Sequence, residues 1–295
     1  LSRRQRQMCI RDRDEYRLIR DYQNGEIIFD RRYGSTNTFE KNNYPVGYNL
    51  GQSGNTPSQN LVDAYEMIDG TPFDWNNPEH KSNPYANRDP RLAMSILTNN
   101  VEFKDRTIEA WTGGRDGKGV IHATRTGYYI YKFIDPNLDL LQNRTSVHHW
   151  VIMRYAEILL SYAEAMNEAY GPTGNVGYRL NAVRALNQVR NRVGVEMPAV
   201  PTAISKEELR EKIRNERRVE LAFEDHRFWD VRRWMIAPET LGTPLRGVEI
   251  TKISDEEFEY KPIEVEKRTF EPKMYLYPIP QADLNTTGWV QNPLW

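Results

Sequence analysis

The spacing of apolar residues along the chain becomes regular near its middle. Beyond Trp150, apolar side chains recur every three or four positions, at Ile152, Tyr155, Leu159, Tyr162, Met166 and Ala169. This spacing places them on one face of an α-helix. We therefore predict an amphipathic helix that begins at about residue 150 and ends at Gly171-Pro172, since a helix interior tolerates neither residue well.

Two more helices are predicted downstream. One covers about 178–193, and the next opens with the capping box Ser205-x-x-Glu208, followed by Leu209 on its apolar stripe. Consecutive helices with short connections form helical hairpins, the unit of tetratricopeptide-type repeats. The strict tetratricopeptide signature is absent, so the pattern predicts helical-hairpin packing and nothing narrower.

The first half of the chain has no such repeat. Its patterns predict only short elements: strands at 26–30, 96–97 and 128–133, and a helix at 61–67. The stretches 34–60 and 71–90 are dense in Gly, Asn, Ser and Pro and are predicted to be loops. We therefore divide the chain into a loop-rich region with short strands, 14–150, which would carry ligand contacts, and a helical region, 151–295.

Two glutamates fall on the inward face of the third predicted helix. A buried carboxylate needs a partner, and arginines are plentiful nearby. We predict a structural ion-pair network of Glu216, Glu220, Arg154, Arg190 and Arg227. The alternative is a metal or acid–base site. It is disfavoured because no Glu-x-x-His pair occurs and because these positions lie mid-helix among arginines, whereas a glycosidase pair lies in an open cleft.

Composition and charge exclude several classes of protein. The chain has 295 residues, of which 39% are hydrophobic and 27% charged, as in globular proteins. Its 40 basic and 41 acidic residues give a formal net charge of −1, which offers no support for nucleic-acid binding. No run of about 18 apolar residues occurs, so no transmembrane helix is expected.

The first 13 residues, LSRRQRQMCIRDR, resemble a translated sequencing adapter, and we treat them as non-native. Without them, 35 basic and 40 acidic residues remain and the formal net charge is −5. The sole cysteine, Cys9, is also removed, so we expect no disulfide, thiolate zinc site or cysteine nucleophile. A signal peptide and a lipid-anchor cysteine would lie upstream of the printed sequence.

Many segments, in matching order and spacing, resemble the C-terminal half of the SusD/RagB family of outer-membrane nutrient-binding lipoproteins. The resemblance runs from about residue 20 to 295 and rests on stretches that include AYEMIDG (64–70), NRDPRL (87–92), RYAEILL (154–160), ERRVELAFE (216–224) and YPIP (277–280). The family usually ends in Gln-Asn-Pro-Gly, whereas Leu294 follows Pro293 here.

This resemblance implies a mainly α-helical fold, a tetratricopeptide-like superhelix of helical hairpins with an irregular loop-rich region. It also implies an outward-facing lipoprotein of the outer membrane that binds nutrient oligosaccharides, sometimes peptides, and delivers them to a SusC-like TonB-dependent transporter. No catalysis, cofactor or metal is implied. Family members are considerably longer, so we expect this chain alone to expose an apolar face and to be poorly stable.

Residue chemistry suggests where a glycan would bind. Aromatic rings cover the apolar face of a sugar, and amides and charged groups bond its hydroxyls. Two aromatic, polar loops combine these groups, and we predict ligand contacts from Trp111, Trp75, Arg115, His122, Asn76 and Tyr85. Trp111 is favoured because its Gly-rich surroundings offer little core to fill. The simpler interpretation is that both tryptophans only pack.

Two other functions stay open at this point. A helical-repeat scaffold would bind proteins or peptides and ignore polysaccharides. A glycosidase with paired carboxylates would release reducing sugar. We favour the binding protein over both.

Overall fold

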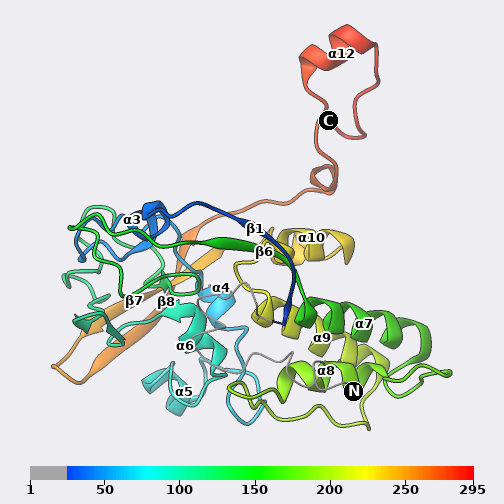
Figure 1. Ribbon diagram of the computed structural model, residues 1–295, viewed down its shortest axis with the longest axis horizontal. Coiled ribbons are helices and arrows are strands. Elements are labelled where there is room, and N and C mark those ends of the chain that lie inside the picture. The colour runs from blue at the N-terminus through cyan, green and yellow to red at the C-terminus, as the bar shows by residue number, and fades with distance from the viewer. Residues whose placement is uncertain (1–24) are drawn as a thin grey trace.

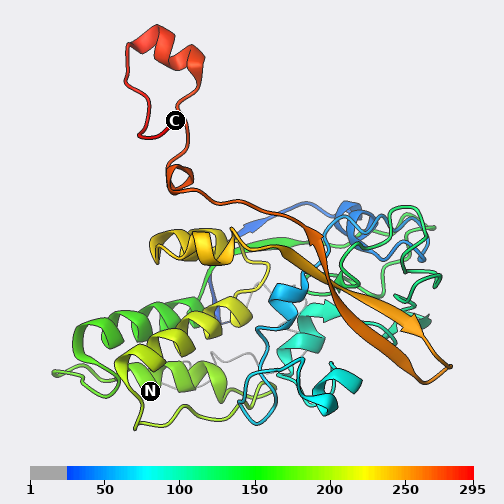
Figure 2. The same ribbon diagram turned by 180° about the vertical axis from the view of Figure 1, so that it is seen from behind.

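The computed structural model describes residues 25–295, so the interpretation of residues 1–13 and Cys9 lies outside the described part of the chain. Figure 1 shows a group of helices, α7 to α10, beside a loop-rich part that holds the short strands. A long hairpin, β7–β8, runs along the loop-rich part, and Figure 2 shows it from behind. The C-terminal segment with α12 extends away from the rest of the molecule in both views.

Most of the elements are short. The helices are α3 (Thr38–Asn43), α4 (Gln59–Val62), α5 (Pro78–Ser82), α6 (Arg91–Ser95), α7 (Tyr155–Tyr170), α8 (Ala182–Arg190), α9 (Lys206–Glu220), α10 (His226–Arg233), α11 (Ala237–Thr240), the 3-10 turn η1 (Pro272–Tyr275) and α12 (Gln281–Thr287). The strands are β1 (Ile27–Arg32), β2 (Ile96–Leu97), β3 (Glu102–Phe103), β4 (Arg106–Thr107), β5 (Tyr129–Ile130), β6 (His149–Arg154), β7 (Leu245–Lys252) and β8 (Phe258–Glu266). They pair as antiparallel two-stranded sheets, β1 with β6, β2 with β5, β3 with β4 and β7 with β8.

The helical part is held by an apolar core between α7, α8 and α9. Helix α7 packs on both α8 and α9. Its buried face includes Leu160 and Ala163, at 0% exposure, which meet Leu186 of α8 and Leu209 of α9 in one cluster. Burying such aliphatic side chains is the main stabilising term for helices of this length. The predicted fold class, helical hairpins beside an irregular region, is confirmed.

Side chains fix where two of these helices begin. Asn181 caps α8, since its Oδ1 accepts from the backbone N–H of Arg184 at 2.9 Å. The predicted capping box opens α9: Ser205 Oγ accepts from the Glu208 N–H at 3.1 Å, and Glu208 Oε2 accepts from the Ser205 N–H at 3.0 Å. The cap at Asn181 makes α8 begin later than the predicted residue 178, and the helix ends at Arg190, before the predicted residue 193.

The predicted start of the first long helix at about residue 150 is wrong. Helix α7 begins at Tyr155, and the residues before it form strand β6, which pairs with β1. The spacing predicted a helix here because Ile152 fits the apolar face of a helix, but Ile152 is 42% exposed and belongs to no buried face. Pairing with β1, far away in sequence, decides the local structure here.

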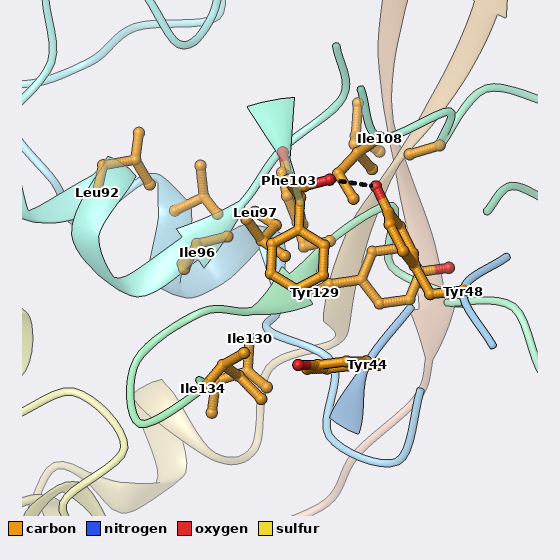
Figure 3. Packing of buried hydrophobic residues seen from close by; sticks show 14 of the residues in the cluster. Tyr44, Tyr48, Leu92, Ile96, Leu97, Phe103, Ile108, Tyr129, Ile130 and Ile134 are labelled. Atoms are coloured by element: carbon orange, nitrogen blue, oxygen red, sulfur yellow. Dashed lines mark hydrogen bonds between the residues drawn. The ribbon is translucent and has the colours of Figure 1, made fainter. Parts of the chain in front are cut away.

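The loop-rich part is built around buried aromatic side chains. Tyr44 and Tyr48 meet the ring of Phe103 edge-on at 5.5 and 5.0 Å, and the Tyr48 hydroxyl donates to the Phe103 carbonyl at 2.8 Å (Figure 3). Tyr129, also in this cluster, is at 0% exposure. Edge-to-face rings with bonded hydroxyls let an irregular chain form a dense core without long regular elements.

The short predicted elements compare with the structure as follows. Strand β2 has the predicted bounds, and its partner β5 covers two residues of the predicted 128–133. Helix α4 lies earlier than the predicted 61–67, because Ser58 caps it by accepting from the Leu61 N–H at 3.3 Å. The β7–β8 hairpin was not predicted. The division of the chain at residue 150 stays a prediction, and β6 spans it.

Candidate functional site

A cleft of about 910 Å³ lies between α5 with its following turn and the β7–β8 hairpin. This is the size range of small-ligand sites in proteins. We call it the hairpin cleft. Its lining residues are Pro78, Lys81, Ser82, Asn83, Tyr85, Ala86, Thr98, Asn99, Asn100, Val101, Ile253, Glu256, Glu257, Phe258, Glu259 and Tyr260.

Four aromatic rings form a continuous series beside this cleft, which we call the aromatic row. Trp111 packs on Phe258 with ring centroids 5.3 Å apart, Phe258 lies 6.4 Å from Tyr260, and Tyr260 meets Tyr85 edge-on at 5.3 Å. Trp111, Phe258 and Tyr85 are half-buried, so part of each ring remains accessible. The ammonium of Lys252 lies 5.0 Å from the Trp111 ring centre, a cation–π contact at the end of the row.

Amides and hydroxyls accompany the rings. Asn99 is held in place, since its Oδ1 accepts from the Ala110 N–H at 3.1 Å and its Nδ2 donates to the Tyr260 hydroxyl at 3.5 Å. Burial raises the pKa of Tyr85 and of Tyr260 above the ordinary value of 10.0, so both hydroxyls are neutral. The Tyr85 hydroxyl donates to the Tyr128 hydroxyl at 3.3 Å, which leaves the Tyr85 oxygen as an acceptor. Asn83 and Asn100 line the same cleft with exposed side chains.

Two of the six predicted contact residues belong to this arrangement. Tyr85 lines the hairpin cleft, and Trp111 reaches it through Phe258. Trp75 is elsewhere: its indole N–H donates to Asp63 Oδ1 at 3.0 Å, and its ring meets Phe73 edge-on at 5.1 Å. The contacts of Trp75 are those of a side chain that anchors its loop.

The remaining three predicted residues are exposed on separate loops. Asn76 Nδ2 donates to Asp74 Oδ1 at 3.0 Å within one turn. Arg115 forms an ion pair with Glu109 at 2.6 Å. His122 has an exposed side chain and a left-handed backbone, with φ of 65°. None of these three residues lines the hairpin cleft, although Arg115 lies in the same loop as Trp111.

A cluster of buried charges lies apart from the cleft. Glu220, at 0% exposure, is in ion pairs with three arginines: Arg154 at 2.7 Å, Arg192 at 2.5 Å and Arg91 at 2.9 Å. Burial alone would raise the pKa of Glu220, but these three guanidinium groups hold it well below its ordinary value.

The cluster continues along α9 and into the loop-rich part. Glu216 pairs with Arg91 at 2.5 Å and with Arg190 at 2.7 Å. Glu224 pairs with Lys132 at 2.5 Å. We call this the buried ion-pair network. Further ion pairs join Asp89 to Arg91, Glu26 to Arg154 and Glu66 to Arg190.

The predicted members of this network are largely brought together. Glu216, Glu220, Arg154 and Arg190 all take part, whereas Arg227 does not, since it belongs to α10, beyond the turn that ends α9, and forms no ion pair with the described residues. The prediction left out Arg91, although its neighbours Asp89 and Pro90 mark a tight turn that would place it. Every network carboxylate meets a guanidinium or an ammonium, so each of these buried negative charges has a counter-charge within reach.

Residues 25–295 offer neither a metal-binding cluster nor a membrane-spanning helix. No group of three or more His, Cys, Asp or Glu side chains in that range is placed to hold a metal ion. No helix in the same range is both long and apolar enough to cross a bilayer.

Comparison with known sequences decides the family. The sequence profile described as the SusD family matches residues 25–295. The chain belongs to the SusD family. Among curated relatives, it is 34% identical over 120 residues to SusD-like protein P2 of Formosa agariphila, which is 39% of this chain and 22% of that protein.

Solved structures of SusD-like proteins share the fold. One from Bacteroides fragilis NCTC 9343 matches with a TM-score of 0.79 and 31% identity, over 96% of this chain and 57% of that one. A second from the same strain, described as a SusD-like carbohydrate-binding protein, matches with a TM-score of 0.73 and 30% identity, over 89% of this chain and 53% of that one. This SusD-family chain thus spans little more than half the length of the matching structures.

The candidate-site residues that sequence reasoning missed in this SusD-family chain are on the hairpin. Phe258 and Tyr260 alternate with polar residues along β8, and Val248 and Ile250 do the same along β7. That period of two is the signal of a half-buried strand pair. Recognising it would have added two rings to the predicted site.

Proposed function

We propose that this chain binds oligosaccharides in the hairpin cleft and does not cleave them. The observation that carries the proposal is the aromatic row beside a cleft lined with asparagines and tyrosine hydroxyls. Rings supply flat apolar surface for the C–H face of a sugar, and the polar groups can bond its hydroxyls. The carbohydrate-binding description of the second B. fragilis protein supports the same ligand class.

Within the cleft, Phe258 and Tyr85 are proposed as the ring surfaces and Asn83 and Asn100 as hydroxyl partners. Trp111 would extend the surface for a longer chain, because it continues the row beyond Phe258. Glu216 and Glu220 are proposed to be structural, since both are buried and held by arginines. Binding without catalysis fits a capture protein.

We further propose that the protein acts at the outer face of the outer membrane and passes its ligand to a SusC-like TonB-dependent transporter. This part rests on membership of the SusD family and on the sequence resemblance. Co-expression with candidate SusC-like TonB-dependent receptors from the same genome, followed by affinity purification, tests it. Recovery of a stable complex supports the proposal, and a receptor that never co-purifies contradicts it.

The binding proposal is tested first with affinity gels that contain a panel of polysaccharides. A capture protein is retarded by at least one of them, whereas a protein-binding scaffold migrates as it does without polysaccharide. The oligosaccharide of the retarding polymer is then titrated by calorimetry into the wild type, Phe258→Ala and Trp111→Ala. Loss of a stacking ring should weaken binding roughly tenfold or more.

Trp229→Ala is the matched control. Trp229 lies on α10 and is 62% exposed, so its loss removes a large surface aromatic outside the hairpin cleft. The proposal expects this variant to bind as the wild type does. Unchanged affinity in Phe258→Ala, with the far-ultraviolet circular dichroism intact, would remove the hairpin cleft as the site.

A further inference from the structure

A second pocket, of about 490 Å³, lies where α4, the α9–α10 connection, α11 and the open end of the β7–β8 hairpin meet. Figure 2 shows α4 beside the start of β7, and these two elements are in contact. We call it the arginine pocket. Its charged lining consists of Arg218, Arg227, Arg246, Arg268, Asp63 and Glu239.

Only one of these arginines has a carboxylate partner among the described residues. Arg246 Nη2 lies 2.7 Å from Asp63 Oδ2, and the other oxygen of Asp63 accepts from Trp75. Arg218 donates to the backbone carbonyl of Asn60. Likewise, Arg268 Nε donates to the backbone carbonyl of Thr243 at 2.9 Å. Arg218 and Arg268 are therefore anchored by neutral carbonyl groups, which leave their positive charge without a carboxylate partner.

Arg227 is the least satisfied of the four. Within residues 25–295 its guanidinium group has neither a hydrogen bond nor an ion pair. Burial lowers its pKa, and so does Arg214, although Asp230 partly opposes them. Its position follows from the turn after α9, where Phe223 and Asp225 have φ of 64° and 63° and reverse the chain. That turn sets Arg227 near Arg218.

Burial and neighbouring positive charge also disfavour the charged form of Arg218. Burial and the nearby Arg227 lower its pKa to about 10. Partly buried like charges without counter-charges destabilise a protein, and an anion that enters between them removes this cost. The planar fork of arginine matches carboxylate, sulfate and phosphate oxygens, with two parallel hydrogen bonds.

We propose that the arginine pocket is a second binding site, separate from the hairpin cleft, which takes a small ligand bearing an oxyanion. The geometry that carries this is four guanidinium groups around one pocket, three of them without a carboxylate partner in the described chain. The oxyanion is either the carboxylate or sulfate of an acidic sugar or a free inorganic ion. The pocket is of a size suited to one small ligand.

Calorimetry with the 295-residue chain at low ionic strength tests the proposal. The probes are glucuronate, galactose 6-sulfate and inorganic sulfate, with glucose as the neutral comparison. Saturable binding of the anions at one site and none of glucose is expected. Tighter binding of the acidic sugars than of sulfate identifies a sugar ligand, and equal or weaker binding identifies a free oxyanion.

Substitutions test whether the anion binds in the arginine pocket. Arg227→Gln should weaken anion affinity at least tenfold, because a charge-assisted contact is lost, while Arg227→Lys should retain part of it. Arg184→Gln is the matched control, since Arg184 is an exposed arginine on α8. Melting curves of each variant show that it is folded.

The proposal is overturned if no anion binds saturably, or if Arg227→Gln binds as tightly as the wild type. Phe258→Ala is expected to leave anion binding unchanged, because Phe258 lines the other cleft. Failure of this proposal is therefore distinguishable from failure of glycan binding in the hairpin cleft.

Discussion

Replacing Glu220 by Gln tests the buried ion-pair network most sharply. The amide preserves the shape of the side chain but removes the charge that faces Arg91, Arg154 and Arg192. It also sets an NH₂ donor among guanidinium donors, where no acceptor replaces the lost oxygen. Because Glu220 is at 0% exposure, water cannot take over the missing contacts.

The expected loss is large. Removing one partner from a buried ion pair costs about 3–5 kcal/mol, against a total stability of roughly 5–15 kcal/mol for ordinary domains. Glu220→Gln should therefore lose at least about a fifth of the free energy of unfolding. The assay is urea denaturation followed by circular dichroism, since urea, unlike guanidinium chloride, does not screen ion pairs.

Glu211→Gln on the same helix is the control. The Glu211 side chain is 69% exposed and pairs with Arg214 one turn away, an interaction worth about 0.5 kcal/mol or less. Similar losses in the two variants, or a loss below about 1 kcal/mol for Glu220→Gln, would refute the reasoning that desolvated charges hold α9 to the loop-rich part.

Three further predictions concern stability. Burial would raise the pKa of Glu220 and Glu224, but surrounding cations hold both pKa values below 4.5. The stability that the two carboxylates contribute is complete above the unfolded pKa and is lost as pH falls through the folded pKa values. The melting temperature should therefore drop steeply below about pH 4.5, and a flat profile contradicts this. Burial raises the pKa of Glu26 in spite of Arg154, so Glu26 works in the opposite direction. Ser205→Ala should cost about 1 kcal/mol in urea unfolding through loss of the capping box, and no measurable change would count against the cap. Gly127→Ala should lower the melting temperature more than Gly113→Ala, because both have positive φ but only at Gly127 would a Cβ lie 2.7 Å from Val248; equal effects would mean that this contact is unimportant.

The helical part was predictable because its signals are local. A stripe every three or four residues, a capping box and a terminal Gly-Pro are all read within one segment. Helix α9 begins at the predicted capping box and α7 ends at the predicted Gly171, although α7 begins later than predicted. The two carboxylates on the inward face of α9 likewise predicted ion pairs, because a buried carboxylate needs a positively charged partner and the chain has many arginines. Which arginines form the ion pairs depends on the tertiary structure, so the prediction missed Arg91 and wrongly included Arg227.

The candidate cleft depends on contacts between distant segments. Tyr85, Trp111 and Phe258 lie far apart in the sequence, and only the hairpin brings them into one row. Aromatic residues in Gly- and Asn-rich loops marked Tyr85 and Trp111, but the same pattern also selected Trp75, which Asp63 anchors elsewhere. Strand β6 shows the same limit, since pairing with β1 overrides a helical spacing.

The central claim is tested most directly by a crystal structure of the chain soaked with an oligosaccharide of the polysaccharide that retards it in affinity gels. The account predicts density for a sugar ring in the hairpin cleft, with its C–H face against Phe258 or Tyr85 and a hydroxyl bonded to a cleft amide. Clear density for the sugar at another surface, such as the exposed Trp229 on α10, with the hairpin cleft empty, would contradict it.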